Sequence, residues 1–256
     1  MKERREQPPS YLVPVSGFAR SFFSGYNIRR GTISVWDASA QEIIAVDQTN
    51  EEGKFGPFQL EPGRRVFFRF EKDQDSWLLG YRTTQTRVFT IPEEGIHAQH
   101  SYLFNVSLQV PSNPAFTLFS YLMWIAENRE CGQIAVTVTL PGTTMDHIPQ
   151  GEPGVEVFLF REGESEPLVL EPYYLGIMPL IDKTDFTGFF GRHQRTSADG
   201  GVLFRNVPAG HYRVVAVNGN MRAEISVVVH PGVLTNASPA WGLVMEESNE
   251  YSSSVP

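Results

Sequence analysis

The histidines and the single cysteine are the residues whose spacing could most directly indicate chemistry. His97 and His100 are separated by two residues, which would let one tight turn chelate a metal, but a zinc site needs three or four ligands and none stands beside them. Cys131 opens a β-type run, where a small buried side chain is usual. Asp146 and His147 could meet Cys131 only through the fold. The sequence therefore predicts no metal site and no cofactor, and it leaves three histidines unassigned: His193, His211 and His230.

Motifs for nucleophilic catalysis and phosphate binding are absent from the sequence. It contains no Gly-x-Ser-x-Gly elbow, the turn that exposes a catalytic serine, and no glycine-rich phosphate loop. We therefore predict no catalytic residue, and we expect the protein to act by binding and not as an enzyme.

The best functional lead is the segment 161–192, the longest stretch without a clear strand pattern. A connection of this length inside a compact domain is usually functional or flexible. Aromatic and arginine side chains dominate the energetics of protein interfaces, so we predict that the segment contacts a protein partner. The alternative is that its rings cover one end of a β-sandwich and are buried in the free protein. The predicted contact residues are Tyr173, Tyr174, Phe189, Phe190 and Arg192.

The composition is that of an ordinary globular protein. Of the 256 residues, 41% are hydrophobic and 20% are charged, and one cysteine cannot form an internal disulfide. The net charge is −8, with 13 basic and 14 acidic residues in 1–127 and 8 and 15 in 128–256. Nucleic-acid binding needs a concentrated basic face, so this distribution argues against nucleic acid as a partner.

The sequence shows no obvious targeting or membrane segment. The N-terminal residues lack the apolar core of a secretory signal, and the most apolar run, 116–126, is far shorter than the ~20 residues that span a bilayer. We therefore expect a soluble cytoplasmic protein, or alternatively one that is exported without an N-terminal signal.

Alternating apolar and polar residues predict short strands in both halves, so the predicted fold is mainly β. We predict two tandem Greek-key β-sandwiches at 11–111 and 130–244, with an insertion at about 161–192. The ends, 1–10 and 245–256, are predicted to be flexible. The predicted strands cover 32–37, 66–70, 102–110, 134–140, 155–160, 212–217 and 223–229.

One helix is predicted inside the connector 112–129, from Pro114 to Glu127. Ser112 supplies a capping side chain, and thirteen residues without Gly or Pro follow Pro114. Apolar residues surround nearly the whole helix, so we expect it to be buried between the two sandwiches, with Leu122 and Trp124 in a shared core. A partner-binding surface and a strand are the alternatives.

The two halves contain a repeat. Thr49 to Phe68 runs parallel to Thr196 to Val214, nearly 150 residues further on. Each copy has a Glu-Gly or Asp-Gly turn, a short strand, a proline-containing turn and a long strand. We expect the glycines to supply positive φ angles, and we expect Tyr212 to bury its ring and hydrogen-bond the preceding turn through its hydroxyl.

The pattern T-x-x-D-G-x-[FV]-x-F-x-x-[VL]-x-P-G-x-Y-x-[VL] resembles that of the carboxypeptidase regulatory-like, or transthyretin-like (prealbumin-like), β-sandwich superfamily. The second copy matches it best, whereas the first has Glu52 for the aspartate and Val66 or Phe67 for the tyrosine. The resemblance implies a seven-stranded, Ig-like Greek-key sandwich in each half. It says almost nothing about function.

The predicted function is non-catalytic recognition of a protein partner, and three alternatives stay open. One is a carbohydrate-binding accessory module. Another is a non-haem iron enzyme similar to the intradiol dioxygenases, which hold iron by two Tyr and two His on a related sandwich; the loose candidates here are Tyr212, Tyr173 or Tyr174, and His193 or His211, without the family's His-x-His pattern. The third follows from Glu246, Glu247 and Glu250, which resemble the C-terminal signal of type IVB secreted effectors.

Overall fold

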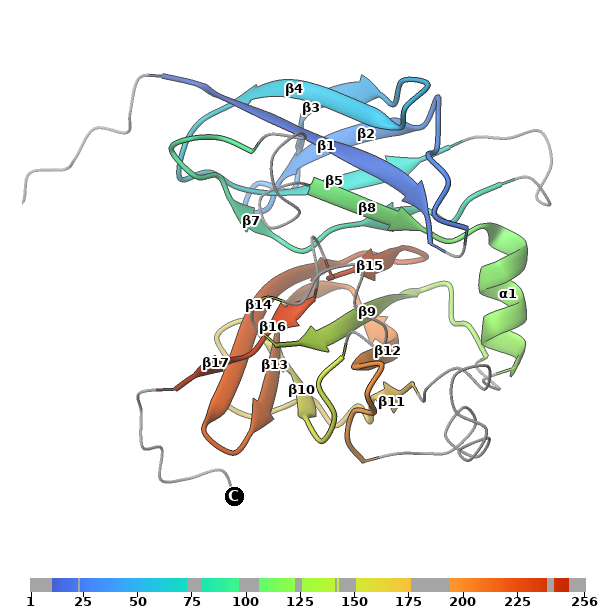
Figure 1. The fold of residues 1–256 in the computed structure, drawn as a ribbon, viewed down its shortest axis with the longest axis vertical. Helices are drawn as coiled ribbons and strands as arrows, with labels where there is room; N and C mark the ends of the chain where they lie inside the picture. Colours follow the sequence, from blue (N-terminus) through green and yellow to red (C-terminus); the bar gives the residue numbers. More distant parts are fainter. Residues whose placement is uncertain are drawn as a thin grey trace, which may run out of the picture.

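The computed structural model describes residues 11–22, 24–72, 80–96, 106–122, 126–140, 142, 151–175, 194–238 and 242–248. Figure 1 shows two β-rich bodies stacked on each other, with the single labelled helix beside their junction. Within the described part of the chain, no helix is long and apolar enough to cross a membrane.

The first half packs two sheets over one hydrophobic core. One sheet has the order β4-β1-β8, and the other contains β3-β2-β5, with β6 and β7 also paired to β5. Alternate side chains of β1 and β8 are buried, as expected for strands with one face on a core. The strands are β1 (Val13–Ser21), β2 (Thr32–Asp37), β3 (Ile43–Gln48), β4 (Lys54–Leu60), β5 (Arg65–Glu71), β6 (Thr84–Gln85), β7 (Phe89–Thr90) and β8 (Val106–Val110).

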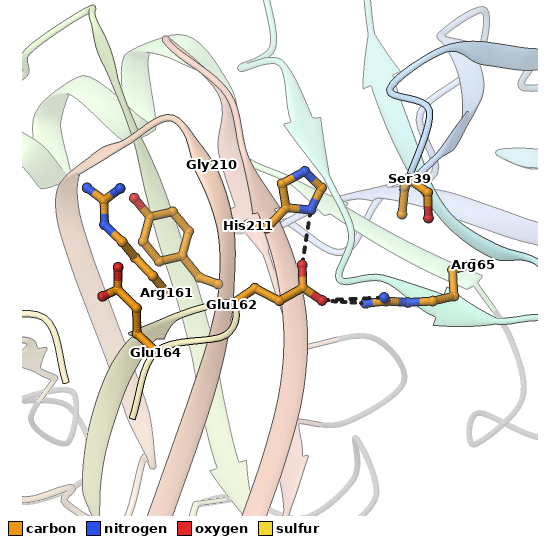
Figure 2. Close-up of a pocket in the computed structure, with 9 residues that line it drawn as sticks. Ser39, Arg65, Arg161, Glu162, Glu164, Gly210 and His211 are labelled. Atoms are coloured by element: carbon orange, nitrogen blue, oxygen red, sulfur yellow. Dashed lines mark hydrogen bonds and ion pairs between the residues drawn. The ribbon is translucent and has the colours of Figure 1, made fainter. Parts of the chain in front are cut away.

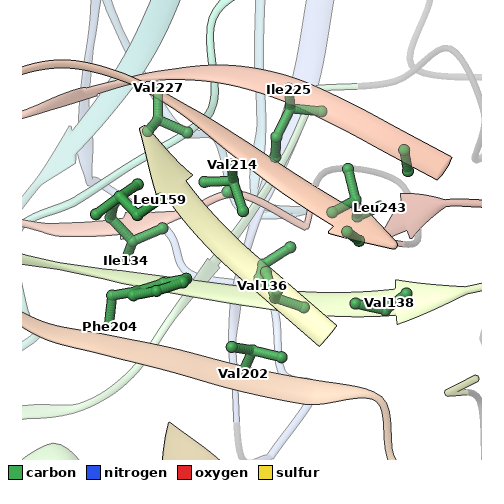
Figure 3. Close-up of a cluster of buried hydrophobic side chains, with 14 of the residues drawn as sticks. Ile134, Val136, Val138, Leu159, Val202, Phe204, Val214, Ile225, Val227 and Leu243 are labelled. Carbon is green, nitrogen blue, oxygen red and sulfur yellow. The ribbon is translucent and has the colours of Figure 1, made fainter. Parts of the chain in front are cut away.

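The second half has its own core between two sheets (Figure 3). One sheet has the order β10-β13-β14-β17, and the other contains β11-β12-β9-β15, with β16 also paired to β9. Apolar side chains from β9, β10, β12, β13 and β14 meet between the sheets. The strands are β9 (Cys131–Thr139), β10 (Glu156–Arg161), β11 (Tyr173–Tyr174), β12 (Gly201–Pro208), β13 (Gly210–Asn218), β14 (Met221–Val229), β15 (Leu234–Asn236), β16 (Leu243–Val244) and β17 (Glu246–Glu247).

The two halves repeat one strand arrangement. In the first, β1 pairs antiparallel with β4 and parallel with β8, while β2 pairs antiparallel with β5. In the second, β9 pairs antiparallel with β12 and parallel with β15 and β16, while β10 pairs antiparallel with β13. The predicted fold class, mainly β with two tandem sandwiches and one short helix, is confirmed.

The turn chemistry of the repeat is also the same in both copies. Gly53 and Gly200 have φ angles of 73° and 62°, as the Glu-Gly and Asp-Gly turns predict. The hydroxyl of Thr49 accepts a hydrogen bond from Gly31 N, and that of Thr196 accepts one from Val155 N, at 2.8 and 2.9 Å. Each buried threonine thus ties the turn of its copy to the start of the preceding strand pair.

Tyr212 adopts the predicted corner arrangement in the second half. Its side chain is 1% exposed, and its hydroxyl donates a 2.8 Å hydrogen bond to Pro208 O. The ring therefore fixes the turn that precedes β13.

The substitution Tyr212→Phe should lower the free energy of unfolding by about 1 kcal/mol, because it removes this hydrogen bond to the Pro208 carbonyl. Denaturant unfolding followed by circular dichroism measures the change. Tyr26→Phe, at a side chain that is 77% exposed, is the matched control and should change stability by less than about 0.5 kcal/mol. Equal effects of the two variants would contradict the corner's role.

A continuous ten-stranded sheet joins the halves. β15 of the second half pairs parallel with β6 of the first, so the order is β11-β12-β9-β15-β6-β5-β2-β3, with β7 and β16 attached. Val88 N donates to Ser226 O, and Asn236 Nδ2 donates to Gln109 O. We call this junction the seam. β6 belongs to the β2–β5 sheet of the first half, whose counterpart in the second half is the β10–β13 sheet. β15 belongs instead to the sheet of β9 and β12, so the two copies join through non-equivalent surfaces.

The seam contains a buried polar network around Gln85, which has no exposed surface. Its Oε1 accepts hydrogen bonds from Nε and Nη2 of Arg69, at 3.3 and 2.9 Å. Its Nε2 donates to Val228 O and to the hydroxyl of Thr235. The Arg69 guanidinium also lies over the Trp36 ring, 4.3 Å from its centroid. Gln85 therefore connects a buried cation of the first half to the backbone of the second.

Aromatic rings and His230 pack beside this network. The His230 ring lies 5.6 Å from the Phe67 centroid and 5.9 Å from that of Trp36. Burial, the charge of Arg69 and the proximity of His211 lower the pKa of His230 to about 4, and its Nδ1 has no hydrogen-bond partner within the described residues. His230 is therefore neutral at pH 7.

Stability should fall as the pH decreases from about 6.5 to about 4. The pKa of His230 is lower in the folded than in the unfolded state, so protonation favours unfolding. Because the ring is partly exposed, we expect a loss of about 1–2 kcal/mol across this range, less than the full shift would give. The check is the difference in unfolding free energy between the wild type and His230→Gln, measured against pH. Parallel curves for the two proteins would contradict this assignment.

The helix α1 (Asn113–Leu122) begins near the predicted residue, and Ser112 Oγ accepts a hydrogen bond from Ala115 N at 3.4 Å. Residues 126–127 are not helical, so the predicted end at Glu127 is wrong. The prediction of burial on all sides is also wrong, because Leu118 and Tyr121 are 59% and 76% exposed while Phe116 is buried. The side chain of Leu122 and the whole of Trp124 lie outside the described residues.

The C-terminal segment predicted to be flexible from residue 245 begins with ordered structure. Met245 has no exposed surface, and β17 pairs Glu246 and Glu247 with β14. The flexible tail is therefore wrongly predicted at 245–248, where an apolar methionine joins the core. Residues 1–10 and 249–256 lie outside the described part of the chain.

Candidate functional site

A cavity of about 560 Å³ lies where the two halves meet. We call it the seam pocket. The first half contributes the turn after β2 and the start of β5, and the second contributes the end of β10, its following turn and the start of β13 (Figure 2). The lining residues are Ala38, Ser39, Arg65, Arg161, Glu162, Glu164, Gly210, His211 and Tyr212.

Glu162 is the central charged group of the pocket. Its Oε1 lies 3.4 Å from both Nη1 and Nη2 of Arg65, and its Oε2 lies 3.5 Å from Nδ1 of His211. Figure 2 shows the carboxylate between these two side chains. The distances exceed the 2.7–2.9 Å typical of a tight charge-assisted hydrogen bond. Glu162 thus bridges the halves through long contacts.

The backbone around the pocket is held firmly. Asp37 Oδ1 accepts hydrogen bonds from Ser39 N and Ala40 N, and its Oδ2 accepts one from Arg64 Nε at 2.8 Å. The Ala40 N–H, with Arg64 and Ser39, lowers the pKa of Asp37 despite partial burial. On the other side, Arg213 Nη2 donates to Glu164 O. The turns that carry Ser39 and Glu164 are therefore fixed, whereas the contacts of the Glu162 carboxylate between them are long.

Two charged side chains of the pocket are not neutralised by the fold. Arg161 lies over the Tyr212 ring, 5.9 Å from its centroid, and within the described residues neither Arg161 nor the carboxylate of Glu164 forms an ion pair. Elsewhere in the same structure Arg64–Asp37 closes to 2.8 Å. The pocket therefore presents a guanidinium and a carboxylate that a bound partner could engage.

The pocket holds a serine, a histidine and a glutamate, the residue types of a hydrolytic triad, but their geometry is not that of a triad. Nucleophilic catalysis needs the serine hydroxyl within hydrogen-bond reach of the imidazole. In the described structure, the Ser39 side chain forms no hydrogen bond to His211, and the His211–Glu162 distance is long. Binding through charged groups is the chemistry that this arrangement favours.

The residues predicted from the sequence to bind a partner lie elsewhere. Tyr173 and Tyr174 form β11, where successive side chains point to opposite faces. Tyr174 is buried in the second core and accepts a hydrogen bond from Val157 N at its hydroxyl, which favours the capping alternative for this ring. Tyr173 is half-buried, with the Arg205 guanidinium 4.4 Å from its ring centroid. Phe189, Phe190 and Arg192 lie outside the described residues, so their role stays a prediction.

The iron-enzyme alternative loses support from its own candidate ligands. The hydroxyl of Tyr212 donates to Pro208 O, and that of Tyr174 accepts from Val157 N, so both phenolic oxygens already serve the fold. Among the described residues, no group of three or more His, Cys, Asp or Glu side chains could hold a metal ion. Cys131 is half-buried at the start of β9. His97, His100, His147 and His193 lie outside the described part of the chain.

The seam pocket could hardly be predicted from the sequence. Arg65 and Glu162 are 97 residues apart and belong to different copies of the repeat, so no local spacing connects them. One local signal is the His211-Tyr212 pair directly after Gly210. The ring of a corner tyrosine faces the core, so the side chain of the preceding residue, His211, is expected on the opposite face.

Comparison with known proteins adds distant structural similarity. No family model matches the sequence, and the curated proteins give no significant match. The Bacillus anthracis TIE protein aligns with 93% of this chain at 12% identity and a TM-score of 0.30, and the match covers 34% of that structure. This chain therefore spans about a third of it. Shaft pilin SpaA from Lactobacillus rhamnosus GG aligns with 94% of this chain and 100% of its own, at 9% identity and a TM-score of 0.26.

A streptococcal ancillary pilin structure aligns with 92% of this chain and 69% of its own, at 9% identity and a TM-score of 0.24. Similarity at this level assigns no function, so the functional argument rests on the seam pocket.

Proposed function

We propose that this chain is a non-catalytic binding protein, built from two transthyretin-like sandwiches, that recognises a protein partner at the seam pocket. The single observation that carries the proposal is the lining of that cavity, in which both halves place charged side chains around loosely held Glu162.

Several properties of the pocket support a protein ligand. Arginine is enriched among the residues that dominate interface energetics, and Arg65 and Arg161 both line the cavity. Fixed turns beneath charged side chains that make only long contacts allow partner groups to replace the Arg65–Glu162 contact at low cost. The carbohydrate alternative fits less well. Tyr212 is the aromatic residue that lines the pocket, and its ring is buried, so it offers no exposed face on which a sugar could stack.

The test is site-specific photo-cross-linking. A photoreactive amino acid in place of Ser39 should yield a discrete covalent complex with one protein in a lysate of the source cells. The same residue in place of Leu118, which is 59% exposed on α1, is the matched control and should not capture that protein. The double variant Arg65→Gln/Arg161→Gln should weaken binding of the captured protein by about ten-fold or more while unfolding as the wild type does. Equal capture from both positions, or binding that the double variant leaves unchanged, would overturn the proposal.

A further inference from the structure

The outer strand β3 is the most open edge of the described sheets. The other edges are shortened or occupied: β11 and β17 have two residues each, and β4 carries Pro57, which lacks a backbone N–H. Leu168 N donates to Leu159 O and thereby covers the edge of β10, while Gln109 O on β8 accepts from Asn236. β3 has six residues and pairs only with β2 among the described strands.

β3 also exposes apolar side chains beside the seam. Ile43 and Val46 are 52% and 59% exposed. They pair with Trp36 and Ser34 of β2, and Trp36 Nε1 donates to Ser34 Oγ, which places all four on one face of the sheet. On that same face, Trp36 packs against the buried seam cluster of Ala38, Phe67 and Val228. The apolar surface that joins the halves therefore continues onto β3, where the second half no longer covers it.

Within β3, the usual protection of a free edge is limited to Asp47 and to an irregular register at the Ile43 end. Natural edge strands carry charged residues, especially lysine, or proline that block pairing with another chain. The one charged side chain of β3, Asp47, already accepts a 2.6 Å hydrogen bond from Gly56 N. The irregular register between Val35 and Trp36 twists only the Ile43 end. Among the described residues, no further backbone group pairs with the outer edge of β3.

We propose that β3 receives an extended segment of a partner protein, added as a further strand, with β-branched or other apolar side chains at alternate positions over Ile43 and Val46. This inference deepens the proposed function, on which it rests for the existence of a protein partner. Main-chain hydrogen bonds would give affinity, and the exposed apolar strip would select the side chains.

Charge and the adjacent seam pocket favour a partner segment over a second copy of this chain. A strand that pairs along β3 is about 20 Å long whichever chain supplies it, too small alone for the 1,200–2,000 Å² that a stable specific interface usually buries, so a symmetric β3–β3 contact by itself would not hold a dimer. Each copy also carries a net charge of −8, so two copies repel, whereas a neutral or basic segment does not. The turn from β2 to β3 supplies Ala38 and Ser39 to the seam pocket, so both surfaces can serve one partner.

The probe is the peptide acetyl-Lys-Thr-Val-Thr-Ile-Thr-Val-Lys-amide, titrated into the ¹⁵N-labelled full chain. We expect shifted resonances and slowed amide exchange at residues 43–48. The same peptide with N-methyl groups on the residues that would hydrogen-bond β3 should bind about ten-fold more weakly. Val46→Lys should weaken binding by a similar factor, whereas Val169→Lys, at a fully exposed side chain beyond β10, should not.

Absence of binding, equal binding of the N-methylated peptide, or shifts confined to other residues would overturn the inference. So would a Val46-dependent dimer in sedimentation velocity, which would identify a second copy as the occupant. The two proposals fail separately. Capture at Ser39 without peptide binding would leave the pocket's function intact and remove the β3 site. Peptide binding without capture at Ser39 would support the β3 site and remove the pocket's function.

Discussion

Replacing Gln85 with alanine should lower the free energy of unfolding by about 3 kcal/mol. The substitution removes the acceptor of the buried Arg69 guanidinium and one of two donors to Val228 O, which keeps its hydrogen bond from the Thr235 hydroxyl. A hydrogen bond to a charged group contributes about 1.5–3 kcal/mol, and an unpaired buried polar group costs a further 1–3 kcal/mol. Denaturant unfolding, followed by tryptophan fluorescence and by circular dichroism, measures the change.

The matched control is Gln59→Ala, at an exposed position on β4, where we expect a change below about 0.5 kcal/mol. Gln85 links the halves, so the halves of Gln85→Ala could begin to unfold independently. In that case the unfolding transitions followed by fluorescence and by circular dichroism should no longer coincide. A loss below about 1 kcal/mol would mean that the seam is held by β6–β15 pairing and apolar contacts alone.

Gly17→Ala should destabilise the first half by about 3 kcal/mol or more. Gly17 lies in β1 at a register shift, between β4 and β8. A Cβ there would stand 2.2 Å from Val106 O and 2.5 Å from Cζ of Phe55, so a backbone strand would have to move. Overpacking a core typically costs about 1–3 kcal/mol, and a clash with backbone belongs at or beyond the upper end.

Gly63→Ala separates this clash from the general effect of replacing a glycine. Gly63 has a φ of 77°, and a Cβ added there would meet no atom within 4 Å. Gly63→Ala should therefore cost only the strain of a left-handed backbone, about 1–2 kcal/mol. Denaturant midpoints of the two variants give the comparison. Equal losses would show that β1 and β8 can separate at little cost.

The turns and the strand types were predictable because their causes are local. Gly53 and Gly200 follow acidic residues in turns that need a positive φ, and the structure gives both that conformation. The Tyr212 corner depends on a tyrosine two residues after Gly210, and its hydrogen bond formed as predicted. The start of α1 follows from Ser112, a capping residue adjacent to it.

Predictions that depended on which neighbour covers a surface were less successful. The sequence pattern around Leu118 and Tyr121 is apolar on every side, but only the tertiary packing decides which side is covered, and both are exposed. Met245 looked like the start of a polar tail, yet the second core had room for its side chain. Burial is a property of the partner surface as well as of the residue.

The sequence by itself determined two mainly β halves with repeated turns, because alternation, glycine and capping act within a few residues. Only the tertiary structure decided how the halves join. The seam pairs β6 with β15, brings Arg65 to Glu162 across 97 residues, and leaves β3 at the end of the described sheet. These contacts depend on the relative position of two folded surfaces, and no local sequence pattern determines that position. The candidate binding sites lie on those surfaces.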